Sequence, residues 1–185
     1  LGYVHISSMD DPSFRSVYAD ILGKYNDREG IVIDTRFNGG GRLHEDIEIL
    51  FSGKKYFTQV VRGREACDMP SRRWNKPSIM VTCEANYSNA HGTPWVYQHQ
   101  GIGKVVGMPV PGTMTSVSWE TLQDPTLYFV QPIVGYRLSD GSYLENKQLE
   151  PDVKIANSPE KIIKGEDEQL ETAVKELLKE IDSKK

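Results

Sequence analysis

A glycine-rich turn between a predicted strand and a predicted helix is the segment of this sequence best suited to chemistry. Residues 34–41 read DTRFNGGG; they follow the apolar run 30–33 and precede a helical pattern at 43–51. Because glycine has no Cβ, three glycines in succession let backbone N–H groups face a cleft. Such a turn can hold an anion, which is either a phosphate or the oxyanion of an acyl-transfer intermediate.

A serine lies at a second strand-to-helix junction. Ser88 follows the continuous apolar run 77–83, which is typical of a buried parallel strand, and precedes a helix predicted to end near residue 100. Binding and catalytic sites of α/β folds form at the carboxyl ends of the strands. Taken alone, Ser88 is an ordinary helix N-cap, and the glycine turn alone serves phosphate binding or a plain turn as often as catalysis.

The two turns together favour nucleophilic catalysis. If strands 31–35 and 79–83 are neighbours, both turns face one crevice. One N–H group of the glycine turn, from Gly39 or Gly40, and the N–H group of Asn89 then converge on a carbonyl oxygen of a group attacked by the serine.

The elements that must position these turns alternate along the chain. Hydrophobic periodicity predicts a strand at 1–6, a helix from about 12 to 25, a strand at 31–35, a helix at 43–52, strands at 54–62 and 77–83, a helix ending near 100, a strand at 104–109 and an amphipathic terminal helix at 166–182. This order predicts an α/β fold with parallel strands and one core domain over residues 1–185.

The remaining segments are less regular. Residues 63–76 read as an exposed basic loop, and 150–153 as an extended turn. The aromatic and β-branched content of 112–145 predicts several strands and turns, including 128–134 and 135–144, the latter around residues 139–142.

Composition excludes several classes of function. The net charge is -4 and the charged content 26%, without a dense basic face, which argues against a nucleic-acid partner. No apolar run approaches the roughly 20 residues of a membrane span. Neither the cysteines nor the histidines have metal-ligand spacing, so we expect no metal and no cofactor. The chain starts at Leu1 within a strand-like run, which indicates a piece of a longer protein and leaves the compartment open between cytoplasm and periplasm.

Three separated segments resemble the tail-specific (C-terminal processing) and tricorn serine peptidases. Residues 33–41 are similar to the D-x-R-x-N-x-G-G segment of that family, 86–90 to its nucleophile segment, and 144–152 to its E-N-x-G-x-x-P-D segment, with Gln148 where glycine is usual. The resemblance covers about residues 1–155. It implies a layered βαβ core of the crotonase and tail-specific protease type, with a peripheral strand-rich segment after 110.

The resemblance also implies roles for particular residues. Ser88 matches the nucleophile, and Glu145 matches a glutamate that orients a general-base histidine through an intervening serine. In the tricorn branch this histidine lies upstream of a PDZ module, so we expect the fragment alone to be inactive. Asn89 stands where the tricorn pattern has aspartate, but its backbone N–H group is unchanged.

The lysine-dependent branch of the family is excluded by spacing. Processing peptidases activate serine with a lysine about 25 residues further on. No lysine occurs between Lys104 and Lys147 in this chain. The implied substrate is a peptide or an unfolded protein.

Other interpretations remain open. The fold can serve as a non-catalytic binding or scaffold module, whereas a phosphate site would need P-loop residues that the segment after the glycines lacks. His91, three positions after Ser88, is either a substitute base or, as we favour, a histidine on the helix surface or in the cleft; His44 reads as exposed. We expect Asp34 and Arg36 to hold the glycine turn, and the terminal helix to pack on the core or to join copies in a homo-oligomer.

Overall fold

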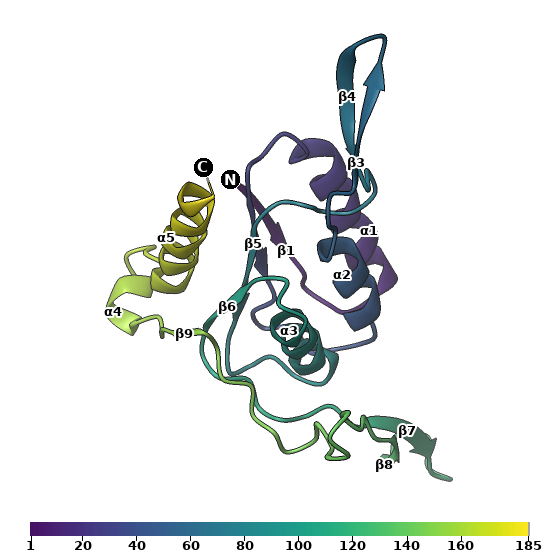
Figure 1. Cartoon of the computed structure of the whole chain (residues 1–185). Helices are drawn as coiled ribbons and strands as arrows, with labels where there is room; N and C mark the ends of the chain where they lie inside the picture. The colour runs from purple at the N-terminus through teal and green to yellow at the C-terminus, as the bar shows by residue number, and fades with distance from the viewer. Residues whose placement is uncertain (185) are drawn as a thin grey trace.

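A parallel five-stranded sheet forms the centre of the structure, a computed structural model that describes residues 1–184 (Figure 1). Its strands, in spatial order, are β1 (Gly2–His5), β2 (Ile31–Asp34), β5 (Ser78–Thr82), β6 (Lys104–Gly107) and β9 (Val153–Lys154). The expected pairing of the second strand with the one before Ser88 is confirmed, with Asp34 beside Val81. The loops after β2 and β5 therefore leave the same edge of the sheet.

Helices cover both faces of the sheet (Figure 1). One face carries α1 (Asp11–Ala19), which continues into the π-helical turn η1 (Asp20–Lys24), together with α2 (His44–Phe51) and α3 (Asn89–His99); the other carries α5 (Glu168–Ser183). The predicted α/β class is thus confirmed. A short helix, α4 (Pro159–Ile162), and the strand β9 form where the sequence analysis expected neither.

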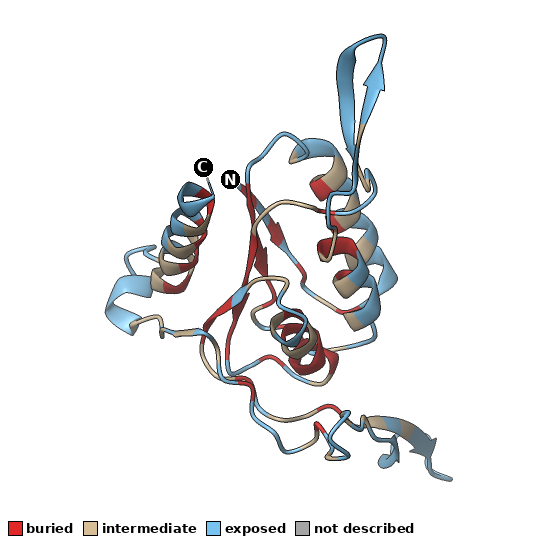
Figure 2. Ribbon diagram, viewed as in Figure 1, coloured by how far each residue is buried: buried red, intermediate tan, exposed pale blue. Residues whose placement is uncertain are grey.

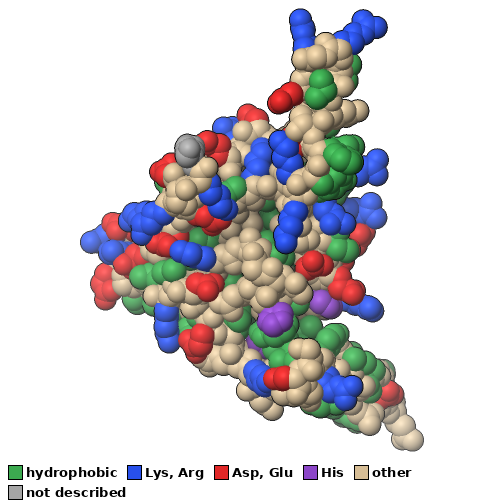
Figure 3. Space-filling model, in the orientation of Figure 1, with side chains coloured by type: hydrophobic (Ala, Val, Ile, Leu, Met, Phe, Trp, Pro, Cys, Tyr) green, Lys and Arg blue, Asp and Glu red, His purple; other side chains and the backbone are tan. Residues whose placement is uncertain are grey.

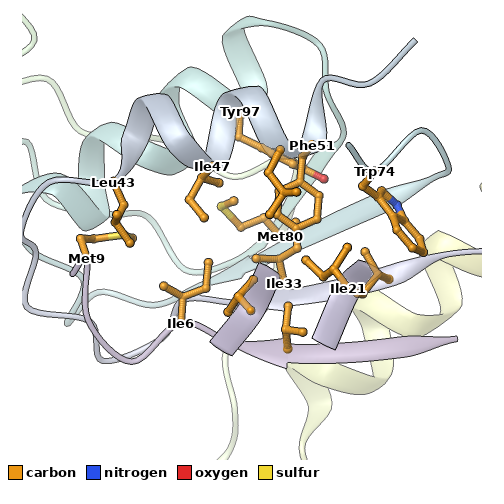
Figure 4. Packing of buried hydrophobic residues seen from close by; sticks show 14 of the residues in the cluster. Ile6, Met9, Ile21, Ile33, Leu43, Ile47, Phe51, Trp74, Met80 and Tyr97 are labelled. Carbon is orange, nitrogen blue, oxygen red and sulfur yellow. The ribbon is translucent and has the colours of Figure 1, made fainter. Parts of the chain in front are cut away.

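Successive side chains of a strand point to opposite faces of the sheet, which explains why there are two hydrophobic cores. Ile31 and Ile33 contact the helices α1 to α3, while Val32 between them faces α5. Figure 4 shows the first core, in which Ile33 and Met80 of the sheet pack beneath Ile47 of α2. The sheet is therefore buried on both sides, which accounts for the uninterrupted apolar runs in its strands.

Two antiparallel hairpins project from this body (Figures 1 and 2). The first pairs β3 (Phe57–Val61) with β4 (Arg64–Met69), so the expectation of a loop throughout 63–76 was wrong. Arg62 and Gly63 form the connection with positive φ angles of 50° and 81°, and such backbone twist suits tight hairpins. β3 falls within the strand predicted at 54–62, but the signal for β4 was obscured because this strand is exposed and lacks an apolar face.

The second hairpin pairs β7 (Ser116–Thr121) with β8 (Tyr128–Val134). Every residue of β8 is exposed, and apolar side chains cover this arm at the lower right of Figure 3. The expectation for 135–144 is met only in part: Arg137 and Tyr143 form an isolated antiparallel bridge around the turn at 139–142, and Leu138 N donates to Ser142 O at 2.7 Å, but no continuous strand forms. Since a lone two-stranded hairpin is marginally stable in water, the folding energy must reside mainly in the sheet and its helices. No helix within residues 1–184 is both long and apolar enough to cross a bilayer.

The contact of α5 with the sheet can be tested at one position. Leu177 is fully buried against Val32 and Val106, whereas its neighbour Leu178 is 44% exposed. We expect Leu177→Ala to lower the free energy of unfolding by about 2–5 kcal/mol, because the substitution leaves a cavity in the second core. The matched control Leu178→Ala should change it by roughly 0.5 kcal/mol or less. Urea unfolding measures both, and equal effects would contradict this packing.

Candidate active site

The glycine turn and the turn that carries Ser88 lie in direct contact. A Cβ atom built on Gly40 would lie 2.7 Å from the Cβ of Ser88 and 3.1 Å from the nitrogen of Asn89. Gly40 also has a φ of 101°, a backbone conformation that favours glycine. Glycine is therefore required here both for its backbone freedom and for the close approach of the two turns.

Ser88 has an unusual backbone conformation at the start of α3. Its φ is 54° and its ψ is -122°, a sparsely populated region for a residue other than glycine. Its N–H group donates to Oγ1 of Thr113 at 3.1 Å, and its carbonyl oxygen accepts from His91 N at 2.8 Å. The half-buried Ser88 hydroxyl makes no hydrogen bond with any residue that the structure describes. The backbone of this serine is thus held while its hydroxyl is left free.

The backbone amides of the two turns differ in availability. Gly40 donates its N–H group to Oδ1 of Asn38 at 2.8 Å. The N–H groups of Gly39 and Asn89 donate to no acceptor within the described residues. Of the amides that the sequence analysis expected at an oxyanion site, those of Gly39 and Asn89 are therefore the ones free to bind an incoming oxygen.

Buried asparagines tie the strand-end loops together. The side-chain Nδ2 of Asn38 donates to Ile6 O at 2.8 Å, and the backbone carbonyl oxygen of Asn38 accepts from Tyr87 N at 3.0 Å. Asn86 donates to Oγ1 of Thr35 at 3.0 Å. These bonds link the loops after β1, β2 and β5 without placing a charge in the interior.

The side chain of Asn89 caps α2 from a different helix. Its Oδ1 accepts from the N–H groups of Leu43 at 2.8 Å and His44 at 3.1 Å, which satisfies amides that a helix start leaves unpaired. Because backbone N–H groups can only donate, the orientation of this amide is determined. Its Nδ2 then donates to Nδ1 of His44, at 2.8 Å. This bond makes Nδ1 of His44 an acceptor and assigns the ring proton to Nε2. His44 is half-buried at this contact, not exposed as expected.

Glu145 lies beside the Ser88 turn without touching it. Its Oε2 accepts from the N–H groups of Met114 at 2.8 Å and Thr115 at 2.7 Å. Burial acts to raise the pKa of Glu145, but these two N–H groups outweigh it and hold the pKa below its usual value. The Thr115 side chain also lowers this pKa, and the other carboxylate oxygen, Oε1, accepts neither of the two N–H groups.

His91 differs from its expected placement. We expected a surface or cleft histidine, but the side chain is fully buried, and neither ring nitrogen has a hydrogen-bond partner among residues 1–184. Burial lowers its pKa, against weaker opposing effects of the Lys147 backbone and the charge of Glu145. The enclosed imidazole of His91 makes no hydrogen bond to the Ser88 hydroxyl, although the backbone N–H group of His91 donates to Ser88 O.

An ion-pair cluster secures the start of the glycine turn. Arg36 contacts Asp34 at 2.7 Å and Asp167 at 2.8 Å. Asp167 is also the N-cap of α5 and accepts from Leu170 N at 3.0 Å, so the cluster joins the turn to the helix on the opposite face. Asp34 and Arg36 thus contact structural partners, as expected.

Two residues of this region were not singled out from the sequence. The N-cap position of Asp167 before the terminal helix was a readable signal, whereas nothing in the sequence around Thr113 indicates its contact with Ser88. Both cysteines are free thiols, and no group of His, Cys, Asp and Glu suited to a metal ion occurs in residues 1–184.

The close approach of the two turns predicts that alanine substitutions at the adjacent residues Gly39 and Gly40 change the stability by different amounts. Gly40→Ala should lower the free energy of unfolding by about 2–4 kcal/mol, because the methyl group overlaps Ser88 and the backbone is strained. Gly39→Ala is the matched control, since a Cβ at Gly39 meets no atom within 4 Å. It should change stability by less than about 1 kcal/mol. Denaturant unfolding of both variants checks the contact, which similar losses would contradict.

The orientation of the Asn89 amide predicts a change in the tautomer of His44. In Asn89→Asp the atom facing Nδ1 becomes a carboxylate oxygen, which can only accept, so Nδ1 must become a donor. Nitrogen NMR spectra of ¹⁵N-histidine-labelled protein at alkaline pH should show the proton on Nε2 in the wild type and on Nδ1 in the variant. His99, which stacks on Trp95, serves as the internal control. An unchanged His44 spectrum would count against the assigned bond.

The comparisons with known proteins agree with the fold and with the order of these segments. The model of peptidase family S41 matches residues 1–155. Tricorn protease homolog 1 of Streptomyces coelicolor is 28% identical over 176 residues, 94% of this chain and 16% of the relative. The tricorn protease of Thermoplasma acidophilum is 24% identical over 182 residues, 98% of this chain and 17% of the relative. The chain therefore spans less than a fifth of the length of these two relatives.

Solved structures show the same fold. A crystal structure of the tricorn protease aligns with a TM-score of 0.87 at 24% identity, covering 98% of this chain and 18% of that one. A photosystem II D1 C-terminal processing protease aligns with a TM-score of 0.61 at 15% identity, covering 83% of this chain and 42% of that one. Because the family model matches most of the length of this chain, residues 1–155, the chain belongs to peptidase family S41.

Proposed function

We propose that this chain is the catalytic core of a tricorn-like serine endopeptidase in which Ser88 is the nucleophile. The observation that supports the proposal is the contact of Gly40 with the Ser88 turn. In these two turns the Ser88 hydroxyl and the N–H groups of Gly39 and Asn89 have no hydrogen-bond partner within the described residues. Membership in a family of serine peptidases supports the same reaction class. The substrate is a peptide or an unfolded protein.

The proposed reaction follows the usual course of acyl transfer. Oγ of Ser88 forms a bond to the scissile carbonyl carbon while its proton passes to a general base, and the carbonyl oxygen becomes an oxyanion. The N–H groups of Gly39 and Asn89 stabilise that oxyanion, and each such donor typically lowers the barrier by roughly 3–4 kcal/mol. The base then returns the proton to the leaving amine, and water releases the acyl group by the reverse sequence.

The general base comes from outside the described residues in this proposal. His91 is buried and His44 has its Nδ1 engaged by Asn89. Oε1 of Glu145, which accepts neither the Met114 nor the Thr115 N–H group, is the oxygen that would orient an upstream histidine through an intervening serine, as the family resemblance implies. An upstream PDZ-like module and a homo-oligomeric assembly are further parts of this proposal for the full-length protein.

The alternative is a binding or scaffold module without catalysis. The reactivity of Ser88 towards a fluorophosphonate distinguishes the two hypotheses, because a scaffold module does not need an activated serine. The strained backbone of Ser88 favours the peptidase, since such strain persists where the surrounding structure enforces it and is concentrated at functional sites.

Replacement of the nucleophile tests the proposal. In the full-length protein, Ser88→Ala should reduce hydrolysis of a fluorogenic peptide by roughly 10⁴-fold or more and abolish fluorophosphonate labelling. The control Ser71→Ala changes an exposed serine and should leave both unchanged. Residues 1–185 alone should be inactive, whereas a protein extended upstream should be active. Equal activity of the two, or activity that survives Ser88→Ala, would reject the assignment.

A further inference from the structure

The segment that follows β6 contacts the Ser88 turn and Glu145 at the same time. Thr113 accepts the N–H group of Ser88 through its hydroxyl oxygen. The next two residues, Met114 and Thr115, donate their N–H groups to Glu145. From this arrangement we propose that Thr113 and Glu145 form a clamp that holds Ser88 in its reactive backbone conformation. Thr113 is then a positioning residue, an inference that rests on the proposed peptidase function.

The conformation of Ser88 needs such support. A residue other than glycine keeps a φ of 54° with a ψ of -122° only where its surroundings enforce it. The bond to Thr113 is the one hydrogen bond that the Ser88 amide makes within the described residues. The Thr113 hydroxyl directs its own proton towards Pro111 O, at 3.5 Å, and so presents a lone pair to Ser88.

The segment carrying Thr113 is itself fixed at several points. Both N–H bonds to Glu145 end on the same carboxylate oxygen, Oε2. The Met114 side chain packs on α3 at Gly92, where a Cβ atom would lie 2.5 Å from its sulfur. Asn146 N donates to Gly112 O at 2.9 Å, which joins the segments on either side. Thr113 is therefore an anchored acceptor rather than a mobile one.

Glu145 consequently acts on the nucleophile without touching it. Its Oε2 holds the 113–115 backbone, and that backbone holds the Ser88 amide. Orientation of an upstream histidine would use the other oxygen, Oε1. The two functions of this carboxylate can be separated because they depend on different atoms and on different properties: the clamp needs an acceptor, and the histidine needs a charge.

Backbone exchange in the full-length protein tests the clamp independently of catalysis. Thr113→Val removes the acceptor at nearly constant volume, while Thr113→Ser keeps the hydroxyl. Hydrogen exchange followed by mass spectrometry should show the amides of peptides spanning 86–92 exchanging about tenfold faster in Thr113→Val, the effect of losing one ordinary hydrogen bond. Thr113→Ser should stay within about twofold of wild type. Thr126→Val, in the β7–β8 connection, is the distant control and should not change exchange there.

Kinetics of the same variants test positioning. Thr113→Val should lower kcat about tenfold or more with KM changed less than about twofold, because the reacting atom is misplaced while substrate contacts remain. Thr113→Ser should recover most of kcat. Glu145→Ala should speed exchange at 86–92, whereas Glu145→Gln, which keeps an acceptor oxygen, should lower kcat with little effect on exchange.

Each outcome decides a separate claim. Exchange at 86–92 that is the same in Thr113→Val and wild type overturns the clamp. Faster exchange with unchanged kcat overturns the positioning role. If wild-type protein shows neither turnover nor fluorophosphonate labelling, the proposed function fails, and the exchange data still decide whether Thr113 and Glu145 hold the turn.

Discussion

The absence of a side chain at Gly40 is the constraint on which the site depends. Parallel pairing of β2 with β5 brings two strand ends to one edge of the sheet, but the turns that follow can meet only if the backbone of one lies against the Cβ of Ser88 in the other. A Cβ at that point would lie 2.7 Å from the Cβ of Ser88, so one of the two turns would have to shift. The proposed oxyanion site depends on this contact, because donors that stabilise an oxyanion must be held in place before the reaction.

Neutral amides hold the contact in place. Asn38, Asn86 and Asn89 each bridge two elements through hydrogen bonds that are buried or nearly so. A neutral amide satisfies backbone donors without the desolvation cost of a buried ion, which can exceed the attraction that the ion gains. The Arg36 cluster is the exception: the side chains of Arg36 and Asp34 are only 11% and 3% exposed, and their pairing with each other and with Asp167 compensates the buried charges while joining the turn to α5. Neutral side chains thus hold the turn that carries Ser88, while the charged side chain of Glu145 holds the neighbouring segment 113–115.

Much of the fold was predictable from the sequence because its elements have strong local signals. Buried parallel strands such as β2 and β5 read as apolar runs, and α5 reads as an amphipathic helix. β4 was missed because its exposed residues show no apolar alternation. In 135–144 aromatic and β-branched residues favour strands, but the pairing there is limited to one bridge, between Arg137 and Tyr143. Local propensity says nothing about the availability of a pairing edge.

Within the site, the sequence by itself determined which residue types stand at the two strand ends: the glycines, Asn38, Ser88 and Asn89. These follow from local chemistry, since glycine is needed for the turn and a polar residue begins the helix. Only the tertiary structure decided that Gly40 lacks a free amide, that His91 is enclosed, and that Thr113 reaches Ser88. These outcomes depend on distances between segments remote in sequence, which packing of the sheet and its helices sets and no local pattern encodes.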